Sequence, residues 1–175
     1  MIRAFKQYTP SIATTAFVDP TALVIGNVFV GEEVSIWPMA VVRGDVNKID
    51  IGDRTNIQDG SVLHVAHEDI EYGVHGFGLK IGRDVTVGHR VVLHGCTIHD
   101  EVLCGIGSII MDGAVVGSHV IVGAGSLVPP GKVLESGYLW LGTPVKKIRP
   151  LTAEEIAYFK YSAQHYVSLA AGYER

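Results

Sequence analysis

Residues 98–128 read IHDEVLCGIGSIIMDGAVVGSHVIVGAGSLV, and an apolar side chain recurs there at every sixth position. The same spacing continues toward the N-terminus in three runs, which two insertions and one five-residue step separate. The recurring positions are Val18, Val24, Val30, Ile36, Val42, Ile51, Ile57, Leu63, Ile81, Val87, Leu93, Ile98, Cys104, Ile110, Val116, Val122 and Val128. Chance would not keep polar residues out of so long a register, so the chain consists of internal repeats.

A six-residue apolar repeat predicts a triangular coil with three short strands in each turn. One aliphatic side chain per strand points inward, and each turn of 18 residues stacks on the next at the strand spacing of about 4.8 Å. Glycine often follows the inward residue, where it relieves crowding at a corner. A β-sandwich would alternate with period two instead. We therefore predict an all-β fold, a parallel β-helix, whose handedness the pattern leaves open.

Extra residues interrupt the six-residue frame of apolar positions twice. Three extra residues lie within 42–51, and twelve lie within 63–81. A continuous frame through the second insertion would bury Asp69 and His75, which is costly without partners. We therefore expect residues 66–78 to form an exposed loop. Loops on rigid scaffolds often carry function.

A helix is expected after the coil. Thr152 can cap it, and Glu155 three residues later completes a capping box. We divide the chain into a β-helix, residues 1–148, and a C-terminal helical segment, residues 149–175. The helix should pack along the coil or onto a neighbouring subunit, which protects exposed strand edges. Its predicted apolar face comprises Ile156, Phe159, Ala163, Tyr166, Val167 and Ala170.

Composition narrows the function classes. A chain with 47% hydrophobic residues and a net charge of −4 is too apolar for disorder and too poor in basic residues for a nucleic-acid-binding face. No uncharged apolar run reaches 18 residues, so we expect no membrane span. The start of the chain lacks the features of a signal peptide, and Cys96 and Cys104 suit a reducing compartment, so we expect a cytoplasmic protein.

Two histidines occupy equivalent positions in successive turns. His64 and His94 are 30 residues apart, and subtracting the twelve looped residues leaves 18, one full turn. Arg43 precedes His64 by 21 residues, which is one turn plus the three inserted residues. The spacing therefore stacks Arg43, His64 and His94 at one corner, where two imidazoles converge at metal-ligand distance.

His89 lies on the preceding face, with Asp59 one turn below it. Five extended residues, roughly 16 Å, separate His89 from His94, so one chain cannot close a three-histidine site. A threefold assembly can, by setting the His89 face of one subunit against the His64 and His94 corner of the next. We predict a metal site between subunits with His64, His89 and His94 as ligands.

At these positions the sequence resembles the γ-class carbonic anhydrase family, in its compact bacterial branch of hexapeptide-repeat proteins. The resemblance covers essentially the whole chain. Its motifs are Arg43-Gly44-Asp45, Asn56-Ile57-Gln58-Asp59, the single His64, and the run from Gly88 through His89 and His94 to Cys96.

The resemblance implies a left-handed β-helix and a homotrimer with three interfacial metal sites. Gln58 would orient metal-bound hydroxide or substrate, and Arg43 and Asp45 would pair across the interface. Asp59 and Asn56 would support the metal ligands, because such partners fix imidazole orientation. An interface salt bridge without catalytic duty is the other interpretation of Arg43 and Asp45.

Three neutral imidazoles leave Zn²⁺ an open position for water, which then ionises near pH 7 instead of about 15.7. The implied reaction is the reversible hydration of CO₂ to bicarbonate by metal-bound hydroxide. Fe²⁺ or Co²⁺ fits the same ligand set. The family archetype exports the proton through a glutamate after the motif aspartate. Val46 stands there in this sequence, which leaves Glu68, Asp69 and Glu71 as the substitutes.

Three alternatives stay open. A hexapeptide acyltransferase acting on a coenzyme A ester needs a histidine base and an open groove, so three converging imidazoles argue against it. A metal-dependent thioesterase would use the same metal hydroxide on such an ester. A non-catalytic metal-binding trimer would serve as a scaffold, and Val46 favours that interpretation.

Overall fold

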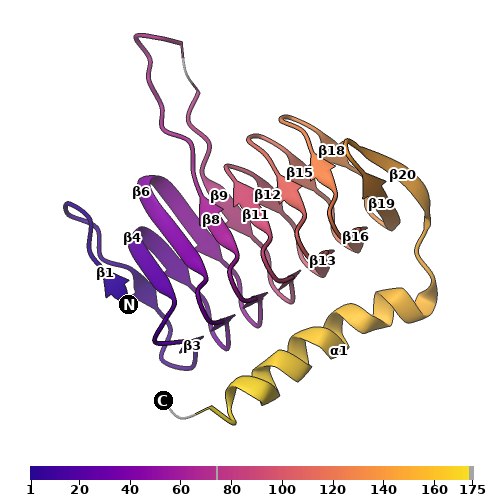
Figure 1. Ribbon diagram of the computed structural model, residues 1–175, viewed down its shortest axis with the longest axis horizontal. Helices are drawn as coiled ribbons and strands as arrows, with labels where there is room; N and C mark the ends of the chain where they lie inside the picture. Colours follow the sequence, from indigo (N-terminus) through magenta and orange to yellow (C-terminus); the bar gives the residue numbers. More distant parts are fainter. Residues whose placement is uncertain (74, 174–175) are drawn as a thin grey trace.

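The computed structural model describes residues 1–73 and 75–173. Val74 of the expected loop, and Glu174 and Arg175 at the end of the predicted helical segment, lie outside the described residues. The chain forms an elongated coil with one helix along its side (Figure 1). This architecture confirms the left-handed parallel β-helix with a C-terminal α-helix.

The strands form three rows that run along the coil. The first row contains β8 (Val62–His64), β11 (Val92–His94), β14 (Ile109–Ile110) and β17 (Leu127–Val128). The second contains β9 (Leu79–Ile81), β12 (Thr97–Ile98), β15 (Val115–Val116) and β18 (Val133–Leu134). The third contains β3 (Phe17–Val18), β5 (Ser35–Ile36), β7 (Asn56–Ile57), β10 (Thr86–Val87), β13 (Val102–Cys104), β16 (Val120–Val122) and β19 (Tyr138–Gly142).

Longer strands connect the first two rows at the N-terminal end. They are β4 (Leu23–Val30) and β6 (Val41–Ile51), and the short strands β1 (Ile2–Arg3) and β2 (Ser11–Ile12) pair with β4. Strand β6 takes up the three inserted residues in an unbroken strand of 11 residues. At the other end β20 (Val145–Pro150) pairs antiparallel with β19, so β structure crosses the predicted boundary between residues 148 and 149.

The core consists of the predicted repeat positions and of a second inward set. Every repeat position from Val24 to Val128 is buried, whereas Val18 is only half-buried. The second set lies two residues before each repeat position, as at Val85, Val91 and Val102. Two inward side chains per strand fill the triangular interior at close-packed density.

Residues between β8 and β9 form the predicted loop, which projects from the body (Figure 1). Its base is closed by an antiparallel pair in which Ala66 and Phe77 exchange backbone hydrogen bonds of 2.9 and 3.2 Å. The Asn47 side chain donates to the Ala66 carbonyl at 3.2 Å. The loop is therefore anchored beside the end of β8, which carries His64.

Helix α1 (Ala153–Ala170) begins with the predicted capping box, in which Thr152 and Glu155 each accept from the other's backbone N–H. It lies along the third row, where Phe159 is buried and Ser162 shares a hydrogen bond with Thr86. Ile156, which was predicted on the packed face, is 38% exposed near the start of the helix, whereas Phe159 three residues later is buried. No helix in residues 1–73 and 75–173 is long and apolar enough to cross a membrane.

Candidate metal centre

His64 and His94 are direct register partners on β8 and β11. The Nδ1 atom of His64 lies 3.1 Å from Nε2 of His94. Val42 pairs with Leu63 in the neighbouring turn, so Arg43, the next residue, lies one turn below His64. The structure thus confirms the stacking of these three residues that their spacing predicted.

Carboxylates hold the outer nitrogen of each ring. Asp45 Oδ1 lies 3.0 Å from His64 Nε2, and Asp112 Oδ1 lies 2.7 Å from His94 Nδ1. An ionised carboxylate only accepts, so each outer nitrogen carries its ring's proton. The two facing nitrogens are then both bare. Sequence reasoning missed Asp112, which stands one residue beyond the position one turn above His94, because the five-residue step shortens this turn and pairs Leu93 with Ile110.

This donor pair fits a divalent cation. Tetrahedral zinc with bonds of 2.0–2.1 Å holds two ligand nitrogens about 3.3 Å apart, close to the observed separation of His64 and His94. Burial lowers the pKa of His64, and the nearby Arg43 charge lowers it further against the opposing effect of Asp45. His64 is therefore neutral at pH 7, the form that binds metal.

His89 is held in the same way on a different part of the coil. Its Nδ1 atom lies 2.9 Å from Asp59 Oδ2, which leaves Nε2 free. Within residues 1–73 and 75–173, no three His, Cys, Asp or Glu side chains of one chain gather closely enough to hold a metal. The predicted third histidine ligand for the His64 and His94 pair would come from a second chain, and this stays a prediction.

Arg43 and Asp45 pair within one chain, through Nη1 and Oδ2. Burial opposes ionisation of Asp45, but hydrogen bonds from His64 and Arg43 and the guanidinium charge outweigh it and lower the pKa of this carboxyl. Asp45 thus links the arginine to the histidine. The pairing across an interface, which the resemblance implies, stays a prediction.

Gln58 and Asn56 form a buried amide chain beside His89 and do not contact the His64 and His94 pair. Gln58 Nε2 donates to Asn56 Oδ1 at 3.0 Å, and Asn56 Nδ2 donates to the Thr86 hydroxyl at 3.1 Å. Gln58 and His89 line one groove of about 430 Å³ between the third strand row and helix α1. Its other walls include Leu103, Ile106, Ile121, Tyr158, Ser162 and Tyr166.

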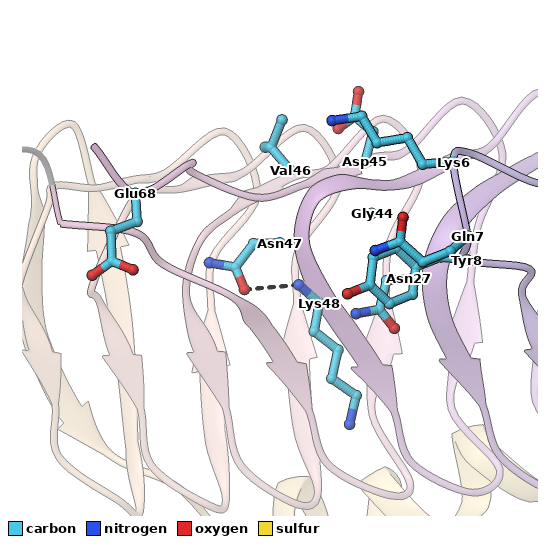
Figure 2. A pocket seen from close by; sticks show the side chains of 10 residues that line it. All are labelled: Lys6, Gln7, Tyr8, Asn27, Gly44, Asp45, Val46, Asn47, Lys48 and Glu68. Atoms are coloured by element: carbon cyan, nitrogen blue, oxygen red, sulfur yellow. Dashed lines mark hydrogen bonds between the residues drawn. The ribbon is translucent and has the colours of Figure 1, made fainter. Parts of the chain in front are cut away.

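A second pocket, of about 360 Å³, lies where β6 meets the projecting loop. Figure 2 shows Asp45 and Val46 at its rim, with Glu68 of the loop on one side and Lys6 on the other. Of the three loop carboxylates proposed as substitutes for the family glutamate, Glu68 lines this pocket. Asp69 instead accepts a hydrogen bond from the Tyr72 amide within the loop.

An aliphatic column faces outward next to the histidine pair. Its members are register partners in successive turns, namely Leu23, Val41, Val62, Val92, Ile109 and Leu127. All of them are exposed or half-buried, and Val62 and Val92 lie two residues before His64 and His94. Apolar strips that reach the surface in this way are typical of protein interfaces, and the predicted subunit contact would bury this one.

The six-residue repeat and the three-row coil define a hexapeptide-repeat β-helix protein. Over 167 residues the chain is 56% identical to protein YrdA of Escherichia coli, spanning 95% of this chain and 90% of that one. It is 42% identical to a carbonic anhydrase of Geobacillus kaustophilus, across 99% and 91% of the two chains. Its identity to γ carbonic anhydrase 1 of Arabidopsis thaliana is 46%, across 92% of this chain and 58% of that one. The chain belongs to the γ-class carbonic anhydrase family.

The fold comparison agrees. A hexapeptide transferase family protein from Anaplasma phagocytophilum superposes with a TM-score of 0.89 at 40% identity, over 99% of this chain and 98% of that one. The chain matches no family model. Relatives named as carbonic anhydrases support a carbonic-anhydrase-like enzyme that uses a metal.

Proposed function

We propose that the protein catalyses the reversible hydration of CO₂ to bicarbonate, with Zn²⁺ held between the subunits of a cytoplasmic homotrimer. The observation that carries this proposal is the pair of facing nitrogens of His64 and His94, 3.1 Å apart, with a carboxylate beside the outer nitrogen of each ring. Two lone pairs at this separation repel each other unless a cation lies between them. Fe²⁺ or Co²⁺ would suit the same donors.

Zinc with three neutral imidazoles activates water near neutral pH. The chain's own residues prepare the ligands for this. Asp45 and Asp59 accept the outer ring protons of His64 and His89, which fixes both rings and raises their basicity. Arg43 holds Asp45 ionised, as the lowered pKa of that carboxyl indicates.

Gln58 is the residue that would orient the substrate. Asn56 binds its amide nitrogen and so leaves the Gln58 carbonyl oxygen aimed away from that contact. The amide is buried, so it loses little conformational freedom on binding a small molecule next to His89.

The incomplete set of metal ligands among the described residues of one chain supports the proposed trimer. A threefold axis parallel to the coil keeps equal turns level. His89 of one chain then faces the level of His94 in its neighbour. Ile106, one turn beyond His89, faces the level of Ile109 in the aliphatic column, and both side chains are exposed in the single chain.

The groove of about 430 Å³ beside His89 favours a second candidate function. It is far larger than CO₂ and mostly apolar, a size that suits a drug-sized molecule. A metal-dependent thioesterase acting on a coenzyme A ester would use the same histidines and place its acyl group in this groove. The transferase name of one structural relative is compatible with this chemistry.

Subunit complementation tests the proposal. We expect the His64→Ala and His89→Ala homotrimers each to bind no zinc and to hydrate no CO₂. Each site needs His64 from one chain and His89 from its neighbour, so a refolded equimolar mixture regains about a quarter of the wild-type sites. Stopped-flow CO₂ hydration and bound zinc should recover together to that level.

Recovery of zinc without hydration would contradict the carbonic anhydrase proposal and direct attention to thioester substrates. Absence of any recovery in correctly assembled trimers would contradict the shared site itself. His165→Ala, an exposed histidine of helix α1, is the control and should leave zinc and hydration unchanged.

A further inference from the structure

Asp112 and Phe77 meet over Gly95, next to His94. A Cβ atom added to Gly95 would lie 2.4 Å from Asp112 Oδ1 and 2.8 Å from Phe77 Cβ. The same Asp112 oxygen accepts from His94 Nδ1 at 2.7 Å. The phenyl ring of Phe77 lies against Gly113, the residue after Asp112, since a Cβ there would be 3.0 Å from its Cε1 atom. The projecting loop thus places Phe77 beside the hydrogen bond that holds His94. Phe77 is 37% exposed, and the His94 and Asp112 side chains are 31% and 26% exposed, so the contact is partly covered.

The backbone conformation does not by itself require glycine at this corner. Gly95 has a φ of +54°, but Glu33, Arg54 and Glu101 occupy other corners of the coil with φ of +55° to +56°. Gly95 differs from them in the space it leaves, which the Asp112 carboxylate and Phe77 fill. Gly131 follows in the same stack of turns with a φ of +67°, and a Cβ there would meet nothing within 4 Å.

We infer that Asp112 is a positioning residue for His94, and that Phe77 shields their hydrogen bond from water. By accepting the Nδ1 proton, Asp112 directs the bare Nε2 atom toward His64. Phe77 covers part of this contact, and a hydrogen bond to a charged group gains strength as access of water is reduced. This inference rests on the proposed metal site. It adds that the projecting loop, through Phe77, helps to hold the ligand His94.

The test combines metal binding with the protonation of the ring. We expect the metal-free wild type to show His94 as the Nδ1–H tautomer in long-range ¹H–¹⁵N NMR spectra. In Asp112→Ala that tautomer should give way to Nε2–H, and the Co²⁺ affinity, measured by chelator competition, should fall about 10- to 100-fold. Asp112→Asn should retain part of the tautomer preference, since the amide oxygen still accepts.

Two matched pairs separate positioning from general damage. Gly95→Ala should reproduce the Asp112→Ala loss, whereas Gly131→Ala, with similar backbone strain, should bind Co²⁺ normally. Glu101→Gln is the control for Asp112, because Glu101 holds His119 at 3.1 Å across one turn in the same manner. Phe77→Ala should weaken Co²⁺ binding by a smaller factor, which Phe77→Leu should restore.

An unchanged His94 tautomer with wild-type Co²⁺ affinity in Asp112→Ala would overturn the inference. A wild-type protein that binds no divalent metal would contradict the proposed function instead. In that case the tautomer of His94 in the metal-free variants would still decide the role of Asp112.

Discussion

Ile106 lies one turn of the coil above His89, because the amide of Gly107 donates to the carbonyl oxygen of His89 at 2.9 Å. Its side chain is 56% exposed in the single chain. The proposed assembly covers this side chain with the aliphatic column of the neighbour, at the level of Ile109. The apolar contact and the shared metal therefore depend on the same surface.

We predict that Ile106→Glu dissociates the trimer and removes metal binding at once, since the charge would be buried without a partner. Light scattering coupled to gel filtration should show a folded monomer with unchanged far-UV circular dichroism. Ile148→Glu, at an exposed position of β20 with 52% exposure, is the control and should remain trimeric. A trimeric Ile106→Glu protein would contradict the predicted interface.

Removal of the Gln58 amide should affect turnover more than metal binding. Gln58 contacts Asn56 and lines the groove with His89, but it touches no metal-ligating nitrogen. We predict that Gln58→Ala lowers kcat/KM for CO₂ about 100- to 1,000-fold, the usual cost of one preorganised hydrogen-bonding group. Its Zn²⁺ affinity should stay within about twofold of wild type. Gln164→Ala on the exposed side of α1 should change neither quantity, and a large loss of zinc in Gln58→Ala would contradict the assigned role.

The coil could be predicted from sequence because a single period, six, determines which side chains point inward. The second inward set escaped that reasoning, since it includes the small polar residues Thr55, Ser61, Ser108 and Ser126. These side chains are buried, and the hydroxyls of Thr55 and Ser61 donate to the carbonyls of Gly82 and Gly88. Apolar periodicity cannot detect such positions.

The site divides in the same way. The stacking of His64 on His94 follows from counting one turn of 18 residues beyond the loop. The count does not reach Asp112, because the five-residue step shortens the next turn and pairs Leu93 with Ile110. The contact of Phe77 with Gly113 does not follow, because the path of the projecting loop has no period. The groove beside His89 likewise depends on where α1 packs. The hydrogen bond between Thr86 and Ser162 helps to set that position, and no sequence pattern links these two residues.

The start of helix α1 predicts a pH-dependent contribution to stability. Hydrogen bonds from Arg149, and then from the Thr152 backbone, lower the pKa of Glu155 to about 2 from its ordinary value of 4.5. A carboxyl whose pKa is lower in the folded state stabilises the protein above its unfolded pKa. This contribution is complete above about pH 4.5 and is lost as the pH falls toward 2.

We therefore expect Glu155→Gln to lower the unfolding midpoint at pH 6, with the difference from wild type shrinking between pH 4.5 and 2. Thermal or urea unfolding, followed by circular dichroism at several pH values, measures this. Glu71→Gln, on the projecting loop away from α1, should show no such difference. A Glu155→Gln deficit that stays constant from pH 6 to pH 2 would contradict the assigned ion pair.

Val46 should limit proton export. It is 47% exposed and lines the pocket of about 360 Å³ together with Asp45 and Glu68 (Figure 2). A carboxylate at this position could accept a proton close to Asp45 and pass it to solvent. We predict that Val46→Glu raises kcat for CO₂ hydration about fivefold at low buffer concentration. The value of kcat/KM should stay nearly unchanged. At high buffer concentration the advantage should disappear, because buffer then carries the proton.

Val46→Gln, of similar size without the charge, should give no increase, and Glu68→Gln should lower kcat at low buffer. An equal gain in Val46→Gln, or no gain in Val46→Glu, would place the proton route elsewhere.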